Sequence, residues 1–340
     1  MSLVIAPLDP SDPAAIDAAL QVTEPARMVD VPDFAPRTHV QFAALLRHPM
    51  PGREQRSALA TLDGVPVGYL ELRMSHLENP DNAGVELVVH PAYRRRGFGR
   101  ALLEYAIRTL RELGRKRLIG PTVGPLPGGV YRPDHGRGFA ATVGAKPALP
   151  EVRRRLEIAN LDHAALDALV ADACNRAAGY RTVCWQETTP EEYLDDVAYL
   201  DSRLILDAPL GDLTMEPDRV DAERIRGTER VLAARGRRAY HHGVLHEATG
   251  RVVAWTMLDL HPTELPWQSF QQITIVDPEH RGHRLGLLCK IENLRYALAH
   301  EPQLRVIDTW NAASNSYMIA VNEQMGFRAV DAWMEWQLDF

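Results

Sequence analysis

A short basic motif that occurs twice, 187 residues apart, constrains this chain more than any other feature. The first copy reads PAYRRRGFG from Pro91 to Gly99, and the second reads PEHRGHRLG from Pro278 to Gly286. Each copy follows a β-branched apolar run and precedes a helical pattern. A strand, a loop and a helix that recur at one spacing indicate two domains with the same plan.

The elements upstream of each motif repeat as well. Residues 57–62 and 65–72 flank Asp63-Gly64, which predicts a hairpin with a type I′ turn. Residues 239–246 and 251–260 flank a longer turn, and short strands are expected at 4–5 and 182–185. Helices are predicted over 99–113, over 160–178 and from Leu287 onwards, where Lys290 lies off the apolar face.

This order predicts a mixed α/β fold in which a sheet is flanked by helices in each half. A length of 340 residues fits two domains of roughly 100–200 residues each. We expect an N-terminal domain over 1–158, a linker helix over 159–179 and a C-terminal domain over 180–340.

Composition excludes several classes of protein. A hydrophobic fraction of 46% is ordinary for a globular chain, and no apolar run approaches the ~20 residues of a membrane span. A net charge of −7 argues against nucleic acid as a partner. Cys174, Cys184 and Cys289 form no Cys-x-x-Cys, so no metal site or disulfide framework is expected. The N-terminus does not resemble a signal peptide, and we expect a cytoplasmic protein that is a monomer or homodimer.

The first motif has the chemistry of an anion site. The first N–H groups of a helix have no intrahelical partner, and they point toward the loop that precedes it. Gly97 and Gly99 let a phosphate approach the backbone, and the neighbouring arginines supply charge. No Lys-Ser/Thr follows, which excludes a P-loop, and Leu102 replaces the third glycine of a dinucleotide fingerprint.

The pattern Arg94-x-x-Gly97-x-Gly99, after Glu-Leu-Val-Val-His-Pro, resembles the acetyl-coenzyme A signature of the GNAT superfamily of N-acetyltransferases. The resemblance implies that acetyl-CoA is the cofactor and that the loop binds its pyrophosphate. It also implies that the edge of the preceding strand binds the pantetheine arm. The implied residues are Leu87, Val88, Val89, Arg94, Arg95, Arg96, Gly97, Phe98, Gly99 and Arg100.

The second copy departs from the signature because Arg284 stands where the first copy has Gly97. Its later helix matches better, with Asn315 at the start and Gly326-Phe327 at the end. The whole chain therefore resembles a tandem GNAT protein, with a domain order similar to that of mycothiol synthases. The resemblance implies further cofactor contacts at Val276, Arg281, Gly282, His283, Arg284, Gly286 and Asn315.

Acetyl transfer needs a group that accepts the amine's proton. Glu86 is the candidate base, and the alternative is an ion pair with a neighbouring arginine. The tyrosine that serves as general acid in the family is replaced by Asn322 and by Ala140 in the two halves. Tyr131 and Tyr317 are possible substitutes, and the Phe340 carboxylate is another candidate base.

The expected function is acetyl-CoA-dependent N-acetylation of a primary amine on a small molecule. Direct transfer in a ternary complex is favoured because no cysteine adjoins a candidate base. Catalysis by the C-terminal domain, a non-catalytic acyl-CoA-binding module and a protein N-acetyltransferase stay open as alternatives.

Four other sequence features carry expectations of their own. His241 and His242 alternate on a strand, which argues against a metal pair. Residues 120–138 are rich in Gly and Pro and form either a lid or a surface insertion, and residues 153–155 are expected on a solvated strand edge. Three tryptophans are assigned to packing rather than to an acceptor pocket: Trp310, Trp333 and Trp336.

Overall fold

The computed structural model describes residues 2–262 and 265–340 and divides the chain into two compact units. Unit 1 comprises Met1–Glu151, Leu210–Glu216 and Asp331–Phe340. Unit 2 comprises Val152–Pro209 and Pro217–Val330. Because each unit draws on separated parts of the sequence, the domain boundaries near 158 and 180 stay a prediction.

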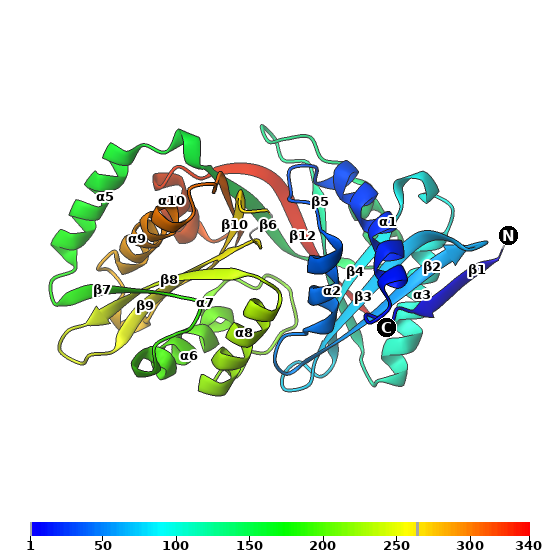
Figure 1. The fold of residues 1–340 in the computed structure, drawn as a ribbon, viewed down its shortest axis with the longest axis horizontal. Coiled ribbons are helices and arrows are strands. Elements are labelled where there is room, and N and C mark those ends of the chain that lie inside the picture. The colour runs from blue at the N-terminus through cyan, green and yellow to red at the C-terminus, as the bar shows by residue number, and fades with distance from the viewer. Residues whose placement is uncertain (1, 263–264) are drawn as a thin grey trace. The chain divides into compact units, whose positions relative to one another are not determined.

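Unit 1 is a mixed sheet with helices on both faces (Figure 1), and its strands follow the order β1-β2-β3-β4-β5-β12. Its last strand comes from the end of the chain, because β12 belongs to this unit from Asp331 onwards. The elements are β1 (Leu3–Pro7), α1 (Pro13–Asp30), α2 (His39–Arg47), β2 (Arg53–Leu62), β3 (Val65–Ser75), β4 (Asn82–Val89), the 3₁₀ turn η1 (Pro91–Tyr93), α3 (Phe98–Glu112), β5 (Arg117–Gly124), α4 (His135–Thr142) and β12 (Arg328–Asp339).

The β2–β3 hairpin forms as predicted. Asp63 and Gly64 both take positive φ, 48° and 85°, as a type I′ turn requires. The two sheet faces bury different cores. Leu70 and Leu72 pack with the apolar stripe of α3, whereas Tyr69 packs with Phe42 under α1 and α2. Alternation along β3 therefore assigns one face to α3 and the other to α1 and α2.

Unit 2 repeats this plan, with strands in the order β6-β11-β10-β9-β8-β7. The part of β6 from Val152 onwards belongs to it. The elements are β6 (Lys146–Glu157), η2 (Ile158–Asn160), α5 (His163–Arg176), β7 (Tyr180–Gln186), η3 (Glu191–Tyr193), α6 (Leu194–Ser202), α7 (Leu204–Asp207), α8 (Ala222–Ala234), β8 (Arg238–His246), β9 (Val252–Leu260), β10 (Gln268–Val276), η4 (Pro278–His280), α9 (Leu285–His300), β11 (Val306–Ala312) and α10 (Ser316–Gln324).

Three sequence-based expectations are wrong in detail. Lys290 is buried, with 2% exposure, because α9 is enclosed on several sides rather than along one stripe. At the expected solvated edge, Arg153 and Arg154 are buried and Arg155 is half-buried. Both Arg153 and Arg155 pair with the buried carboxylate of Asp308. Residues 120–124 belong to β5 and 135–138 to α4, so the Gly/Pro-rich connection spans only residues 125–134.

Among the described residues, no helix combines the length and apolar character needed to cross a membrane. Over the same residues, no group of His, Cys, Asp and Glu side chains has the arrangement of a metal site. His241 stacks between Trp185 and Trp255, with ring planes 7° apart in both pairs. This histidine is part of the core of unit 2.

Candidate functional site

In unit 1, two parallel strands separate just before the basic loop. β4 pairs with β5 only from Asn82 to Gly84, whereas its pairing with β3 continues to Val89. Gly120 lies at the point of separation, where an added Cβ would come within 2.8 Å of the Val85 carbonyl oxygen. The backbone of residues 85–89 is thus left without a strand partner on the β5 side, within the described chain, and it is available to a ligand.

The loop after β4 has the backbone of an anion cradle. Arg95 and Gly97 both take positive φ, 63° and 89°, and α3 begins at Phe98 with no side chain capping its N-terminus. An added Cβ at Gly97 would meet nothing within 4 Å. The free N–H groups of the first turn therefore face open space, where a negative charge is favoured.

Unit 2 repeats the separation and the loop. β10 pairs with β11 only from Gln268 to Phe270, while its pairing with β9 reaches Val276. Its loop takes positive φ at Gly282 (90°) and Arg284 (57°), the counterparts of Arg95 and Gly97. The two loops share a backbone, but glycine occupies the first left-handed position in unit 2 and the second in unit 1.

The basic side chains of the unit 2 loop already form ion pairs or hydrogen bonds with other residues of unit 2. Arg284 forms an ion pair with Asp172 at 2.8 Å, and Arg281 forms one with Asp207 at 2.8 Å. His283 contacts the carbonyl oxygen of Arg176 through Nδ1 at 2.9 Å. The predicted cofactor residues of this loop thus lie together, but several already have partners.

The first arginine of each motif fastens the loop to the preceding strand. Arg94 donates from Nε to the Val89 carbonyl oxygen at 3.1 Å, and Arg281 donates to that of Val276 at 3.3 Å. Arg94 also pairs with Asp30 at 2.7 Å. In unit 1 the exposed cations left for a phosphate are Arg95, Arg96 and Arg100.

The geometry of unit 1 fits acetyl-CoA. A pyrophosphate needs several N–H donors, positive charge and room for close approach, and the start of α3 supplies all three. A pantetheine arm carries amides that require backbone partners, and the β4 edge offers them at Leu87 and Val89, whereas the backbone of Val88 is turned toward β3. Gly99 has less space, since an added Cβ would lie 3.3 Å from the ring of Phe139.

Glu86 lies on the α1/α2 face of the sheet, opposite Glu71 of β3. Glu71 accepts a hydrogen bond from the Tyr69 hydroxyl at 3.0 Å, and Arg37 donates to Glu86 at 3.3 Å. Burial and the Glu86 charge raise the pKa of Glu71. Burial also acts to raise the pKa of Glu86, but Arg37 and Arg73 outweigh it, so that this pKa is lowered. Glu86 is therefore an ionised, paired carboxylate.

A third carboxylate on this face, Glu335 of β12, was missed by sequence reasoning. It lies directly opposite Pro121 of β5. Burial and repulsion from Glu151 raise the pKa of Glu335 to about 7, against an opposing attraction to Arg73. No local signal identifies this residue, because only the long-range pairing of β12 with β5 brings it to the site.

The other predicted site residues outside the two loops, both catalytic and cofactor-binding, lie in exposed or structural positions. Tyr131 and Tyr317 are 83% and 62% exposed. Asn315 caps α10 by accepting from the Met318 N–H at 3.2 Å. The ring of Phe340 packs with the α3-side core, on the sheet face opposite Glu86.

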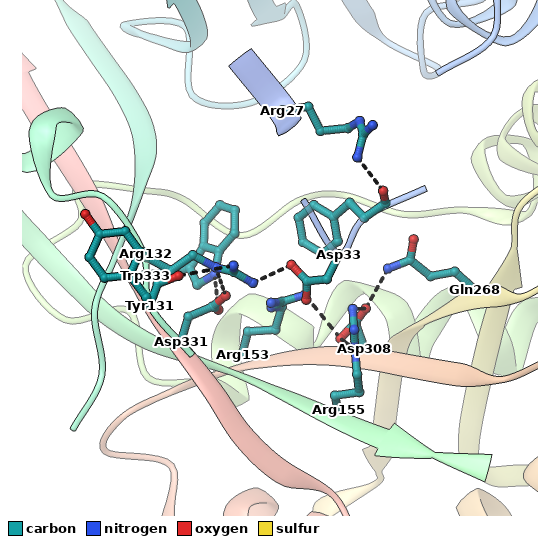
Figure 2. Close-up of polar contacts among 11 residues, drawn as sticks. Arg27, Asp33, Tyr131, Arg132, Arg153, Arg155, Gln268, Asp308, Asp331 and Trp333 are labelled. Carbon is teal, nitrogen blue, oxygen red and sulfur yellow. Dashed lines mark hydrogen bonds and ion pairs between the residues drawn. The ribbon is translucent and has the colours of Figure 1, made fainter. Parts of the chain in front are cut away.

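Figure 2 shows how the connection at residues 125–134 is held in unit 1. Arg132 is 4% exposed and pairs with Asp331 at 2.7 Å and with Asp33, while Tyr131 points away from these contacts. Trp333 donates to the same Asp331 at 2.8 Å. Figure 2 also shows a separate cluster in unit 2, where Asp308 accepts from Arg155 and Gln268.

Comparison with known proteins bears on this geometry. Residues 25–123 match the family model described as Acetyltransferase (GNAT) family. A curated mycothiol acetyltransferase from Thermomonospora curvata is 52% identical over 62 residues, which is 18% of each chain. The match thus spans less than a fifth of that relative's length.

Solved structures cover the whole chain. A tandem GNAT protein from the clavulanic acid biosynthesis pathway has 32% identity and a TM-score of 0.84, and the match covers 99% of this chain and 98% of that one. A GCN5-related N-acetyltransferase from Sphaerobacter thermophilus has 13% identity and a TM-score of 0.64, over 99% and 95% of the two chains; at that identity it supports the fold alone. The repeated loop and the whole-chain match at 32% identity lead to one conclusion: the chain belongs to the GNAT family of acetyl-CoA-dependent N-acetyltransferases, in its tandem form.

Proposed function

We propose that unit 1 transfers the acetyl group of acetyl-CoA to a primary amine of a small molecule, directly and within a ternary complex. The observation that carries the proposal is the open cradle at Gly97, next to a strand edge with unpaired backbone. Unit 2 has the same backbone path, but Arg284 replaces the glycine and is paired with Asp172.

Each part of unit 1 has a distinct role in this proposal. The first-turn amides of α3, with Arg95 and Arg96, hold the pyrophosphate, and Arg94 keeps the loop against the strand. The backbone groups of Leu87 and Val89 that face away from β3 hold the pantetheine arm and orient the thioester carbonyl, which lowers the barrier by stabilising developing negative charge. The bound acetyl-CoA supplies an acetyl group activated as a thioester.

Direct transfer is supported by the state of the cysteines. Cys289 is fully buried, and burial raises the pKa of its thiol to about 12. A thiol with this pKa is a poor nucleophile at neutral pH, because the thiolate is the reactive form. Cys174 and Cys184 are exposed and belong to unit 2 rather than to unit 1. An acyl-enzyme intermediate is therefore disfavoured.

The acceptor is proposed to be a cationic amine. Glu71, Glu86 and Glu335 share the α1/α2 face of the sheet, and only Glu71 and Glu86 have arginine partners at ion-pair distance. A surplus of negative charge favours an ammonium group. The names of two relatives, a mycothiol acetyltransferase and a clavulanic acid pathway protein, support a small-molecule acceptor.

Initial-rate kinetics with acetyl-CoA and a panel of small primary amines test this function. Intersecting double-reciprocal plots are expected for a ternary complex, and parallel plots would contradict it. Gly97→Glu should abolish transfer because it places a carboxylate in the cradle. Gly64→Glu is the matched control, since Gly64 has a similar φ of 85° and open space in a distant turn. Full activity in Gly97→Glu would move the working site out of unit 1.

A further inference from the structure

We propose that Glu335, on the last strand of the chain, is the group that accepts the proton of the acceptor ammonium in unit 1. The inference rests on the proposed function, and it assigns a proton acceptor that lies outside the repeated motif. Two observations support the inference. Glu335 lies beside the point where β4 and β5 separate, and its carboxylate has no hydrogen-bond or ion-pair partner among the described residues.

The strand register places Glu335 and Glu86 on the same face. Gly84 pairs with Ile119, and Pro121 pairs with Glu335. Directly paired residues, and residues two apart on one strand, project to the same side of a sheet. Glu335 therefore shares a face with Glu86 and lies level with it, two strands away. Two ordinary strand spacings amount to about 10 Å, and the separation of β4 from β5 adds to this distance.

This common face is the one covered by α1 and α2. Tyr69, which packs with Phe42 of α2, lies two residues from Glu71, the residue opposite Glu86. Trp333, two residues before Glu335, contacts the ring of Phe34 just after α1, with centroids 6.3 Å apart. An amine that approaches the β4–β5 gap from this side therefore passes between Glu86 and Glu335.

Glu335 differs from its neighbours in being unpaired. Glu71 is bound by Arg73 at 2.8 Å and Glu86 by Arg37 at 3.3 Å. In the described part of the chain, the carboxylate of Glu335 has no hydrogen bond or ion pair. A carboxylate in this state is free to bind an ammonium and to take its proton.

The charges around Glu335 set its proton affinity. Glu151 of β6 repels it, and Arg73 of β3 attracts it. The other acids on its own strand are engaged, Asp331 by Arg132 and Asp339 by Arg117. Burial and Glu151 dominate, so that the pKa of Glu335 is raised to about 7.

That pKa suits the task better than the lowered pKa of Glu86. A general base works best when its pKa lies near the working pH, because it is then both ionised and basic. Glu86 is ionised at neutral pH, but its ion pair with Arg37 weakens its affinity for a proton. We assign to Glu86 the role of orienting Arg37 and adding negative charge to the face.

The proton balance is complete. Glu335 takes one proton from the ammonium, which frees the nitrogen lone pair to attack the thioester carbonyl carbon. The C–N bond forms and the C–S bond breaks, and the sulfur leaves with the electron pair. The second nitrogen proton goes to the sulfur, giving an amide and a free thiol. Glu335 then releases its proton to water.

Titration of the protein without substrates tests the proton affinity directly. In protein with ¹³C-labelled glutamate carboxyls, one resonance that is absent from Glu335→Gln should titrate near pH 7. Glu151→Gln should move that midpoint to lower pH, because it removes the repelling charge. A Glu335 midpoint in the ordinary range near 4.5 would overturn the proposal.

Kinetics test the role in transfer. Glu335→Gln should lower kcat roughly 10²–10⁴-fold, the usual contribution of a general base, with little change in acetyl-CoA affinity by calorimetry. The rising limb of the wild-type profile of kcat/KM against pH, which reports the free enzyme, should lie near 7 and should shift to lower pH in Glu151→Gln. Glu112→Gln, an exposed substitution at the end of α3, is the control.

Two outcomes separate this proposal from the function on which it rests. If the wild-type protein acetylates amines and Glu335→Gln does so equally well with an unchanged pH profile, Glu335 is not the base while the function stands. If the wild-type protein acetylates no primary amine, the proposed function fails and the assignment fails with it. A loss of acetyl-CoA binding in Glu335→Gln would indicate a structural role instead.

Discussion

At the residue scale, the two loops show how one backbone is built from different residues. Both loops have two left-handed positions, and each places glycine at only one of them. An L-residue in this conformation costs about 1–2 kcal/mol, which Arg95 and Arg284 bear in their respective units. The residue directly before the helix is therefore Gly97 in unit 1, and it is the long cationic side chain of Arg284 in unit 2.

Gly97→Ala should weaken acetyl-CoA binding at least tenfold, because a methyl group then projects into the cradle and left-handed backbone becomes costly. Gly64→Ala, at a similar φ of 85° with equal open space, should lose the same ~1–2 kcal/mol of stability but bind normally. Calorimetric affinities and urea unfolding of both variants check this. Equal affinity in the two variants would contradict the role of Gly97.

Lys290 should make the stability of unit 2 depend on pH. Its ammonium donates to Asn322 and lies 4.9 Å from the centroid of the Phe327 ring, and no carboxylate of the described residues pairs with it. Burial lowers the pKa of Lys290 to about 7. Because this pKa is below the unfolded value of 10.5, stability is lost as pH falls from about 10 to about 7.

Lys290→Met should remove this dependence. The free energy of unfolding of the wild-type protein should fall by up to about 4 kcal/mol more than that of Lys290→Met between pH 10 and pH 6. Denaturant unfolding of both proteins at the two pH values measures the difference. If the free energy of unfolding depends on pH in the same way in both proteins, Lys290 stays protonated in the folded state without a loss of stability.

At the element scale, β4 and β5 separate at the point where Gly120 of β5 lies close to the backbone of Val85 of β4. Gly120→Ala should cost about 1–3 kcal/mol, because its Cβ would meet the Val85 backbone at 2.8 Å. Gly84→Ala is the control, since its Cβ would meet the Arg73 side chain at 3.4 Å, which is ordinary van der Waals distance. Thermal unfolding compares them, and equal losses would mean that Gly120 does not set the strand spacing.

The sequence predicts local elements well and distant pairings poorly. The hairpin at Asp63-Gly64 and the helix after Gly97 both follow from nearby residues, and the structure has each of them. The pairing of β12 with β5 has no local signal, so Glu335 was not anticipated. The burial of Lys290 was missed because periodicity reports one apolar face and not how many faces are covered.

At the scale of the whole molecule, each unit is completed by distant segments of the chain. Unit 1 takes in Leu210–Glu216 and Asp331–Phe340. In unit 1, Asn82 donates to the carbonyl oxygen of Thr214 at 2.8 Å. A fragment that ends near residue 158 therefore lacks the strand that carries Glu335, and full-length protein is required for every assay of this site.

The central claim is that unit 1 holds the working acetyl-CoA site. Isothermal calorimetry with acetyl-CoA on the wild-type protein, Gly97→Glu and Gly286→Glu tests it most directly. The account predicts one site per chain, lost in Gly97→Glu and kept in Gly286→Glu. Binding that survives in Gly97→Glu and disappears in Gly286→Glu would contradict it, and would place the working site in unit 2.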